Sequence, residues 1–261
     1  MASDIYGNLY DYPQYYDILF GADWKEEFRF LIGCFERFAE QRVRRVFEPA
    51  CGTGRLLVKL AQAGYRVSGN DLNEKAVAYC NARLRRKGFP ASVRVGDMSD
   101  FQVARPVDAA FNLINTVRHL PTERAMESHL RCVHDALRPG GIYLLGLHLT
   151  PTQGTPIEDE AWTGRRGRVE VSSYMWSKEL DRRKRNERLG IRFEIRTPTR
   201  TFSIEDEMNY RTYTAAQMDQ LLDRVPGFEV IETYDFLYRF DEPIVVGPRT
   251  EDVVYVLRRQ G

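Results

Sequence analysis

The sequence has few cysteines and lacks an apolar run long enough to cross a membrane. Its four cysteines, Cys34, Cys51, Cys80 and Cys132, stand far apart, with no C-x-x-C pair and no histidine at ligand spacing. This spacing argues against a disulfide framework and against a zinc site. The first residues are polar and aromatic rather than basic and then apolar, and no run of about 18 apolar residues occurs. We therefore expect a cytoplasmic protein with no bound metal and no membrane partner.

The sequence also lacks an excess of either charge. Its 261 residues include 38 basic and 37 acidic ones, which gives a formal net charge of +1. No global field would draw such a chain onto nucleic acid, so we expect no nucleic-acid partner. The basic run at 182–185 alternates with acidic residues, which predicts a solvated hairpin tip. The length and the 43% hydrophobic content suit one large α/β domain, with room for a sub-domain.

The glycine-rich stretch 48–55, E-P-A-C-G-T-G-R, lacks the marks of two common phosphate-binding loops. A third glycine after Gly52 and Gly54 is missing, as is a P-loop lysine. The stretch follows an apolar run at 43–47 and leads into LLVKLAQAG, which predicts a strand, a tight loop and a helix. Glu48 at the strand end would repel a pyrophosphate. A carboxylate there suits a ligand with amino and sulfonium positive charge, such as S-adenosylmethionine.

The same stretch resembles the first motif of the class I S-adenosylmethionine-dependent methyltransferases, in their small-molecule form. The resemblance implies that Glu48, Ala50, Gly52 and Gly54 contact S-adenosylmethionine, which leaves as S-adenosylhomocysteine. Ala50 stands where the family most often has its first glycine, so we expect a negative φ at Ala50. The turn R-P-G-G at 138–141 resembles the family's stop before its fifth strand.

Strand-like and helix-like segments alternate through the middle of the chain, which predicts a parallel sheet with crossover helices. The resemblance implies a seven-stranded, mostly parallel, doubly wound sheet whose last strand is antiparallel. Alternating apolar and polar residues within 151–213 predict an antiparallel β insertion after strand five, which forms either the acceptor pocket or the interface of a homodimer. We divide the chain into an N-terminal aromatic segment with a cap helix, a cofactor-binding core, this insertion and a C-terminal part of the core, at 1–42, 43–150, 151–213 and 214–261. Within these parts we expect strands at 43–47, 65–70, 91–96, 107–114, 141–149, 228–236 and 252–257, and helices at 73–87, 121–137 and from 214 onward.

Five tyrosines precede an amphipathic helix predicted to start at Asp23, with Glu26 three residues on. One interpretation is that the tyrosines pack as a staple that holds this helix down. The other rests on the resemblance, since many small-molecule methyltransferases carry a Tyr-Asp pair that covers the cofactor. Tyr16 and Asp17 resemble that pair.

Asp71 closes the second predicted strand, 17 residues after Gly54. A carboxylate at that edge can accept hydrogen bonds from both ribose hydroxyls of a nucleoside. Leu72 would then offer an apolar face to the adenine. The alternative is that Asp71 caps the following helix.

Asp97, Met98 and Asn115 follow the next two strands. The resemblance places Asp97 on the adenine amino group, Met98 against the ring and Asn115 beside the methionine part of the cofactor. A simple turn, in which Asp97 bonds its own backbone, is the alternative for the first two. The loop after the fourth strand lacks the Pro-Pro motif of base-modifying amino-methyltransferases, which disfavours a nucleic-acid substrate.

His119 and His148 lie near the carboxyl ends of the fourth and fifth strands, where α/β sites open. Both are candidate general bases, because the reference pKa of histidine is about 6.5. We expect an enzyme that moves a methyl group from S-adenosylmethionine to nitrogen, oxygen or carbon of a small molecule. An RNA methyltransferase and a non-catalytic S-adenosylmethionine-binding module are the alternatives.

Overall fold

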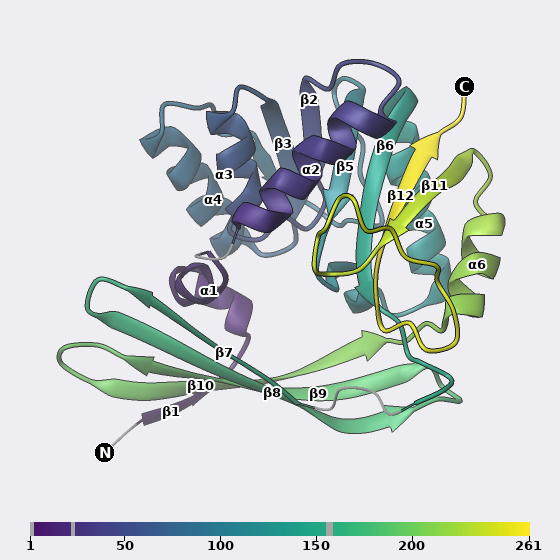
Figure 1. The fold of residues 1–261 in the computed structure, drawn as a ribbon. Coiled ribbons are helices and arrows are strands. Elements are labelled where there is room, and N and C mark those ends of the chain that lie inside the picture. The colour runs from purple at the N-terminus through teal and green to yellow at the C-terminus, as the bar shows by residue number, and fades with distance from the viewer. Residues whose placement is uncertain (1–2, 22–23, 155–158) are drawn as a thin grey trace.

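The computed structural model describes residues 3–21, 24–154 and 159–261 and arranges them around two β-sheets, one above the other (Figure 1). The upper sheet has seven strands, and five neighbouring ones are parallel. The last strand along the chain is antiparallel to both of its neighbours, as the resemblance implied. In spatial order the strands are β4 (Val93–Val95), β3 (Arg66–Asp71), β2 (Arg45–Glu48), β5 (Val107–Asn112), β6 (Leu137–His148), β12 (Asp252–Arg259) and β11 (Phe228–Tyr234).

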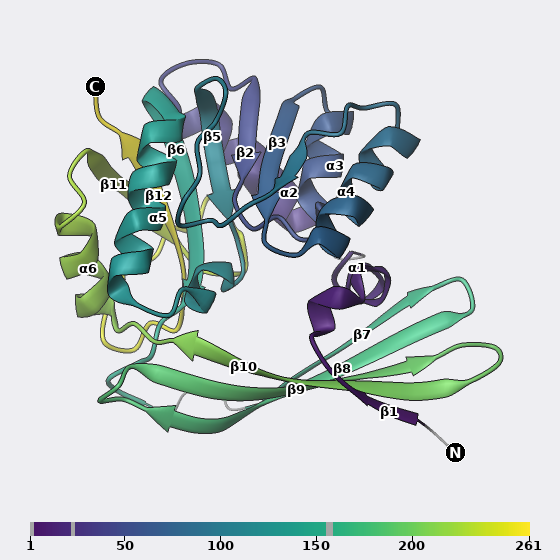
Figure 2. The ribbon, with the colours of Figure 1, turned by 180° about the vertical axis from the view of Figure 1, so that it is seen from behind.

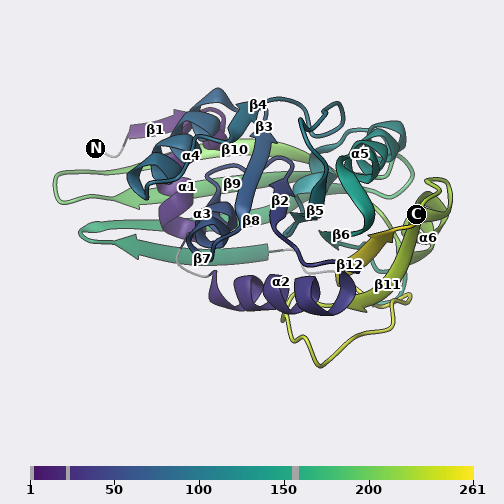
Figure 3. The same ribbon diagram turned by 90° about the horizontal axis from the view of Figure 1, so that it is seen from above.

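Helices cover both faces of this sheet, so it is doubly wound (Figures 2 and 3). Successive strand residues point to opposite faces, so Val46 belongs to one core and Phe47 to the other. The first core packs under α2 (Lys25–Phe38), α3 (Arg55–Gln62) and α4 (Glu74–Arg86). The second packs under α5 (Glu123–Ala136) and α6 (Ala215–Asp223).

The lower sheet is formed by the predicted insertion together with the N-terminal segment. Its order is β1 (Ser3–Tyr6), β10 (Thr201–Arg211), β9 (Asn186–Arg196), β8 (Val169–Asp181) and β7 (Asp159–Arg166). Neighbours are antiparallel except β1, which pairs parallel with β10. The basic run at 182–185 is the turn between β8 and β9, which is the predicted hairpin tip. No pattern in the sequence predicted that the N-terminal segment joins this sheet.

Helix α1 (Pro13–Phe20) lies between the two sheets (Figure 1). A third core joins it to the inner face of the lower sheet, and the partly buried Tyr10, Tyr12, Tyr15 and Tyr16 pack against this core. Gly164 of β7 makes the close approach feasible, since a Cβ there would lie 2.3 Å from the carbonyl oxygen of Ile18. The tyrosines therefore hold α1 to the lower sheet and do not staple the helix that follows.

Most predicted bounds lie within two residues of those in the structure, and the start of β6 is an exception. Strand β6 begins at Leu137, and the predicted turn at 138–141 is an irregularity in its pairing with β5, with Gly140 at φ 74°. Asp23, the predicted helix cap, lies outside the described residues. Trp24 occupies the N-cap position of α2 and makes no side-chain cap bond.

Candidate functional site

The glycine loop follows β2 and turns through three left-handed residues. Gly52 and Gly54 have φ of 52° and 66°, and Ala50 has φ of 47°. The expected negative φ at Ala50 is therefore wrong. The backbone N–H of Ala50 donates to Asn70 Oδ1 at 3.2 Å, which helps to hold the alanine in a conformation that costs on the order of 1–2 kcal/mol. A Cβ on Gly52 would meet no atom within 4 Å, so the loop borders open space.

Glu48 ends β2 beside this loop. Its Oε2 atom is buried and has no hydrogen-bond partner among the residues that the structure describes. Burial raises the pKa of this carboxyl well above its usual value, although the nearby Arg55 opposes the shift. Arg55 itself donates to Glu27 on α2. A buried acceptor beside open space fits a ligand that brings a cationic donor, so this end of the site suits the amino group of S-adenosylmethionine.

Asp71 links the glycine loop to the next strand. Its Oδ2 accepts the N–H of Gly52 at 2.7 Å, and its Oδ1 accepts the N–H of Asn73 at 2.8 Å. The cap of α4 is Asn73, whose side chain accepts from Lys75 and Ala76, so the alternative of Asp71 as that cap is wrong. A carboxylate has about four acceptor positions, so both oxygens of Asp71 can accept further hydrogen bonds.

Three large apolar side chains are exposed at the carboxyl ends of three strands of the upper sheet. Leu72 after β3 is 67% exposed, Val95 at the end of β4 52%, and Ile114 after β5 41%. Exposed apolar surface at this edge suits a flat, apolar ligand such as adenine. Of the three, the sequence indicated only Leu72. All three are apolar residues at the point where a strand ends at this edge. This pattern in the sequence could have predicted the other two.

Asp97 and Met98 adopt the simple turn that was their alternative interpretation. Asp97 Oδ1 accepts from the N–H and the hydroxyl of Ser99, at 2.7 and 2.8 Å. Met98 is 6% exposed and packs in the second core, so its expected thioether surface toward the adenine is not found. Its carbonyl oxygen faces the buried His129, 2.8 Å from Nδ1.

Helix α1 carries Tyr16 close enough to Asp71 and Arg55 for their charges to act on its hydroxyl. Burial, the main cause, raises the pKa of Tyr16 and keeps the phenol neutral. The adjacent Asp17 is buried and forms ion pairs with Arg83 of α4, at 2.7 Å, and Arg166 of β7, at 2.8 Å. Asp17 therefore fixes α1 to both layers.

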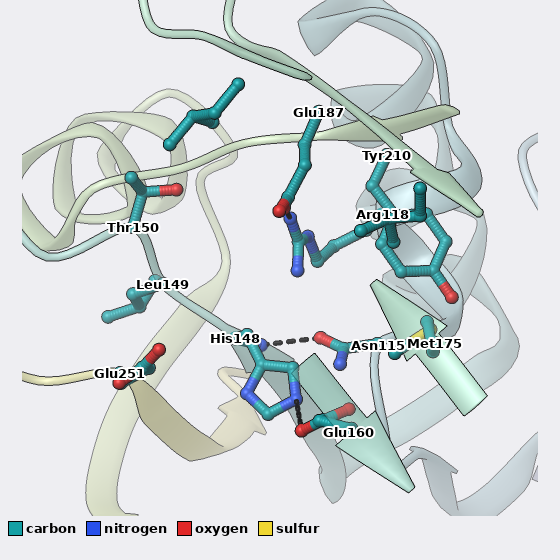
Figure 4. Close-up of a pocket in the computed structure, with 12 residues that line it drawn as sticks. Asn115, Arg118, His148, Leu149, Thr150, Glu160, Met175, Glu187, Tyr210 and Glu251 are labelled. Carbon is teal, nitrogen blue, oxygen red and sulfur yellow. Dashed lines mark hydrogen bonds and ion pairs between the residues drawn. The ribbon is translucent and has the colours of Figure 1, made fainter. Parts of the chain in front are cut away.

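A cavity of about 60 Å³ lies between the end of β6 and the lower sheet (Figure 4). We call it the acceptor cavity. Its lining includes three carboxylates, Glu160, Glu187 and Glu251, and one guanidinium, that of Arg118. Arg118 pairs with Glu187 at 2.7 Å. The remaining lining residues are Asn115, His148, Leu149, Thr150, Met175, Leu180, Leu189 and Tyr210.

His148 lies on one wall of the acceptor cavity, within reach of two carboxylates. Its Nδ1 bonds Asp252 Oδ1 of β12, and its Nε2 is 4.0 Å from Glu160 Oε1 of β7 (Figure 4). Asn115 Oδ1 accepts the backbone N–H of His148 at 2.6 Å, so Asn115 joins the ends of β5 and β6. The sequence indicated His148 and Asn115 but missed both acids, which are distant in the chain.

His119 lies beside the acceptor cavity rather than in its lining. Its Nε2 is 2.8 Å from the hydroxyl of Tyr10, and its ring meets Tyr210 edge-on at 4.8 Å. Burial, with a smaller effect of Arg118, lowers the pKa of His119 to about 4. His119 is therefore neutral at physiological pH. Tyr10 was missed, since nothing in the sequence ties residue 10 to residue 119.

No group of three or more His, Cys, Asp or Glu side chains within 3–21, 24–154 and 159–261 is arranged to hold a metal ion. In the same residues, no helix is both long and apolar enough to cross a membrane.

Comparison with known proteins points to one kind of enzyme. Residues 46–141 match the family model described as a methyltransferase domain. A provisionally named methyltransferase of Geobacillus sp. (strain WCH70) is 25% identical over 77% of this chain and 81% of its own. The dTDP-3-amino-3,6-dideoxy-α-D-glucopyranose N,N-dimethyltransferase of Streptomyces fradiae is 24% identical over 77% of this chain and 76% of its own. A solved S-adenosylmethionine-dependent methyltransferase from Clostridium acetobutylicum ATCC 824 has the same fold, with a TM-score of 0.77, 19% identity, and coverage of 97% of this chain and 100% of that one.

Proposed function

We propose, from the premise that this chain is a class I S-adenosylmethionine-dependent methyltransferase, that it methylates the amine of a small molecule bound in the acceptor cavity. The observation that carries the proposal is the charge of the cavity lining. Three carboxylates face one guanidinium, which is already paired. Such a lining attracts a cationic amine and disfavours an anionic acceptor.

The cofactor residues support the same reaction. Glu48 would accept the amino group, Asp71 the ribose hydroxyls, and Leu72 would cover the adenine, while Gly52 and Gly54 bring the backbone close. Tyr16 on α1 would cover the bound cofactor from the side of the lower sheet. When bound, S-adenosylmethionine supplies an activated methyl group on a cationic sulfur. No metal is needed for this chemistry, because the leaving group is already positively charged.

This chain's own contribution would be alignment and the exclusion of water. Holding two reactants in line can be worth an effective molarity of about 10⁵ M or more. The lower sheet closes the acceptor cavity from below, and α1 lies between the two sheets (Figure 1). His119 and Tyr10 are both neutral at pH 7, because burial lowers the pKa of one and raises that of the other. A neutral pair suits orientation of a polar acceptor.

The relative from Streptomyces fradiae is named for a dTDP-linked amino sugar. Amino sugars are therefore the first acceptors to test. The protein would be incubated with S-adenosylmethionine and amino sugars, free and dTDP-linked, and S-adenosylhomocysteine would be measured. Matched sugars with a hydroxyl in place of the amine serve as controls. Turnover of the amines alone is expected, whereas turnover of the hydroxyl compounds alone would refute the amine assignment.

Two rivals are tested by the same assay. An RNA methyltransferase would form S-adenosylhomocysteine with RNA and with none of the small amines. A binding module would bind the cofactor and form no product with any acceptor. The balanced charge of the chain and the small volume of the cavity both disfavour RNA.

A further inference from the structure

The side chains around His148 form a chain of three groups from three strands. Asp252 of β12 bonds Nδ1, and Glu160 of β7 faces Nε2 across 4.0 Å. A carboxylate on Nδ1 holds the proton on that nitrogen, so the lone pair of Nε2 faces the acceptor cavity. The sequence separation of these residues is large, and only the contact of the two sheets brings Glu160 to His148.

We propose that His148, oriented by Asp252 and faced by Glu160, accepts the proton that an ammonium acceptor must lose before methyl transfer. The inference rests on the proposed amine substrate. It adds that the amine binds in its protonated form and that His148 removes the proton. An amine that arrives in water near pH 7 is largely protonated, and its lone pair is then unavailable. A group that removes the proton inside the cavity lets the enzyme use the abundant form.

The gap between His148 and Glu160 has the right size for this role. Two atoms 4.0 Å apart leave room for a nitrogen that is about 2.8–3.0 Å from each, which is hydrogen-bond distance. Glu160 would hold the ammonium by one N–H and Nε2 would take the proton of another. Burial raises the pKa of Glu160, and the neighbouring His148 opposes this shift. A cationic ligand beside Glu160 would favour its charged form.

The proton balance is simple. One N–H bond of the ammonium breaks, its electron pair stays on nitrogen, and the proton bonds to Nε2. After transfer the imidazolium gives this proton to water, so the cycle releases one proton for each methyl group. Among the described residues, the charged groups that face His148 or Glu160 are Asp252, Glu251 and Arg118, and the ring centroid of Phe236 lies 5.0 Å from that of the imidazole.

The first test detects the ammonium without a known acceptor. In protein with ¹³C-labelled histidine, the His148 signal is assigned by its loss in His148→Gln. Titration with methylammonium chloride should move this signal saturably, whereas tetramethylammonium, which has no N–H, should not. Glu160→Gln should weaken the methylammonium effect at least fivefold. No movement, equal movement with both cations, or an unchanged effect in Glu160→Gln would overturn the proposal.

The second test follows the proton, using whichever amine the acceptor assay identifies. His148→Gln should lower kcat/KM at least tenfold at pH 7, and the loss should shrink as rising pH supplies neutral amine. Asp252→Asn should show the same trend more weakly. His134→Gln serves as the control, since His134 lies on α5 outside the cavity lining. A loss in His148→Gln that is equal at every pH would contradict proton acceptance.

If the wild-type protein methylates no amine, the proposed function fails. The methylammonium titration still decides whether an ammonium group binds between His148 and Glu160.

Discussion

At the scale of single residues, the site depends on carboxylates and histidines whose burial sets their charge. Glu48 keeps a buried oxygen that has no hydrogen-bond partner among the described residues, whereas each oxygen of Asp71 accepts a backbone N–H. A carboxylate that arranges the glycine loop and also contacts the ligand should matter more for binding than for folding. This difference can be measured.

Replacing Asp71 by alanine should weaken binding of S-adenosylhomocysteine by roughly 2–4 kcal/mol, because charge-assisted hydrogen bonds to the ribose and to the loop are lost. Thr122→Ala is the matched control. It removes the N-cap of α5, which accepts the N–H of Ala125, and should cost about 1 kcal/mol of stability with affinity unchanged. Calorimetry and thermal melts measure both quantities. Normal affinity in Asp71→Ala would show that its role is confined to the loop.

The two buried histidines give a pH prediction. Burial lowers the pKa of His119 and of His129 to about 4 in the folded protein, below the unfolded value of about 6.5. Their contribution to stability is therefore complete above pH 6.5 and is lost as pH falls toward 4. The loss is on the order of 3 kcal/mol for each. Their NMR signals should stay at the neutral position down to about pH 5, and titration of either one near pH 6.5 would contradict the burial.

At the scale of elements, α1 joins the helices of the upper layer to the lower sheet. Asp17 pairs with Arg83 of α4 and Arg166 of β7, and the hydroxyl of Tyr79 donates to it at 3.0 Å. One buried carboxylate thus connects three elements. The sequence marked Asp17 only as the neighbour of Tyr16, because the two arginines are distant in the chain.

Asp17→Asn should loosen α1. Removing one partner of a buried ion pair costs about 3 kcal/mol, since Arg83 keeps a charge that is mostly withdrawn from water. Hydrogen exchange of residues 13–20 should become faster, while exchange of α6 at residues 215–223, which lies on the far core, should not change. Retention of S-adenosylhomocysteine should fall in parallel. Unchanged exchange at 13–20 would show that the tyrosine packing alone holds the helix.

The lower sheet explains why the insertion cannot simply be removed. Strand β1 pairs with β10, and α1 buries Ile18 and Leu19 against the same core. Cutting out residues 151–210 would expose those residues together with the tyrosines, so loss of activity in such a variant would not isolate the acceptor pocket. Point changes in the cavity lining test the pocket more cleanly.

At the scale of the whole molecule, local sequence patterns predicted the upper sheet but did not predict the long-range contacts. The run E-P-A-C-G-T-G-R and the alternation of strands and helices lie within short windows, so they predicted the seven-stranded fold, which the structure confirms. The pairing of β1 with β10 and the contact of Tyr10 with His119 each join residues more than 100 positions apart. Periodicity carries no information about such partners.

The backbone of Ala50 was mispredicted for a related reason. Alanine rarely adopts a positive φ. The hydrogen bond that helps to hold Ala50 in this conformation comes from Asn70 on the next strand. The assignments of Tyr16, Glu48, Asp71, Leu72, Asp97 and Asn115 to the cofactor stay predictions. Leu72 is exposed and the Oε2 atom of Glu48 is buried, and both lie at the same edge of the sheet. These positions are compatible with the assignments.

The most direct test of the central claim is to follow the methyl group itself. The protein would be incubated with S-adenosylmethionine carrying a ¹³C-labelled methyl group and with an equal mixture of an amino sugar and its hydroxyl counterpart. NMR of the products distinguishes an N-methyl from an O-methyl signal. We predict a ¹³C signal from an N-methyl group and S-adenosylhomocysteine in matching amount. Label on the hydroxyl compound, with the amine untouched, would contradict the account.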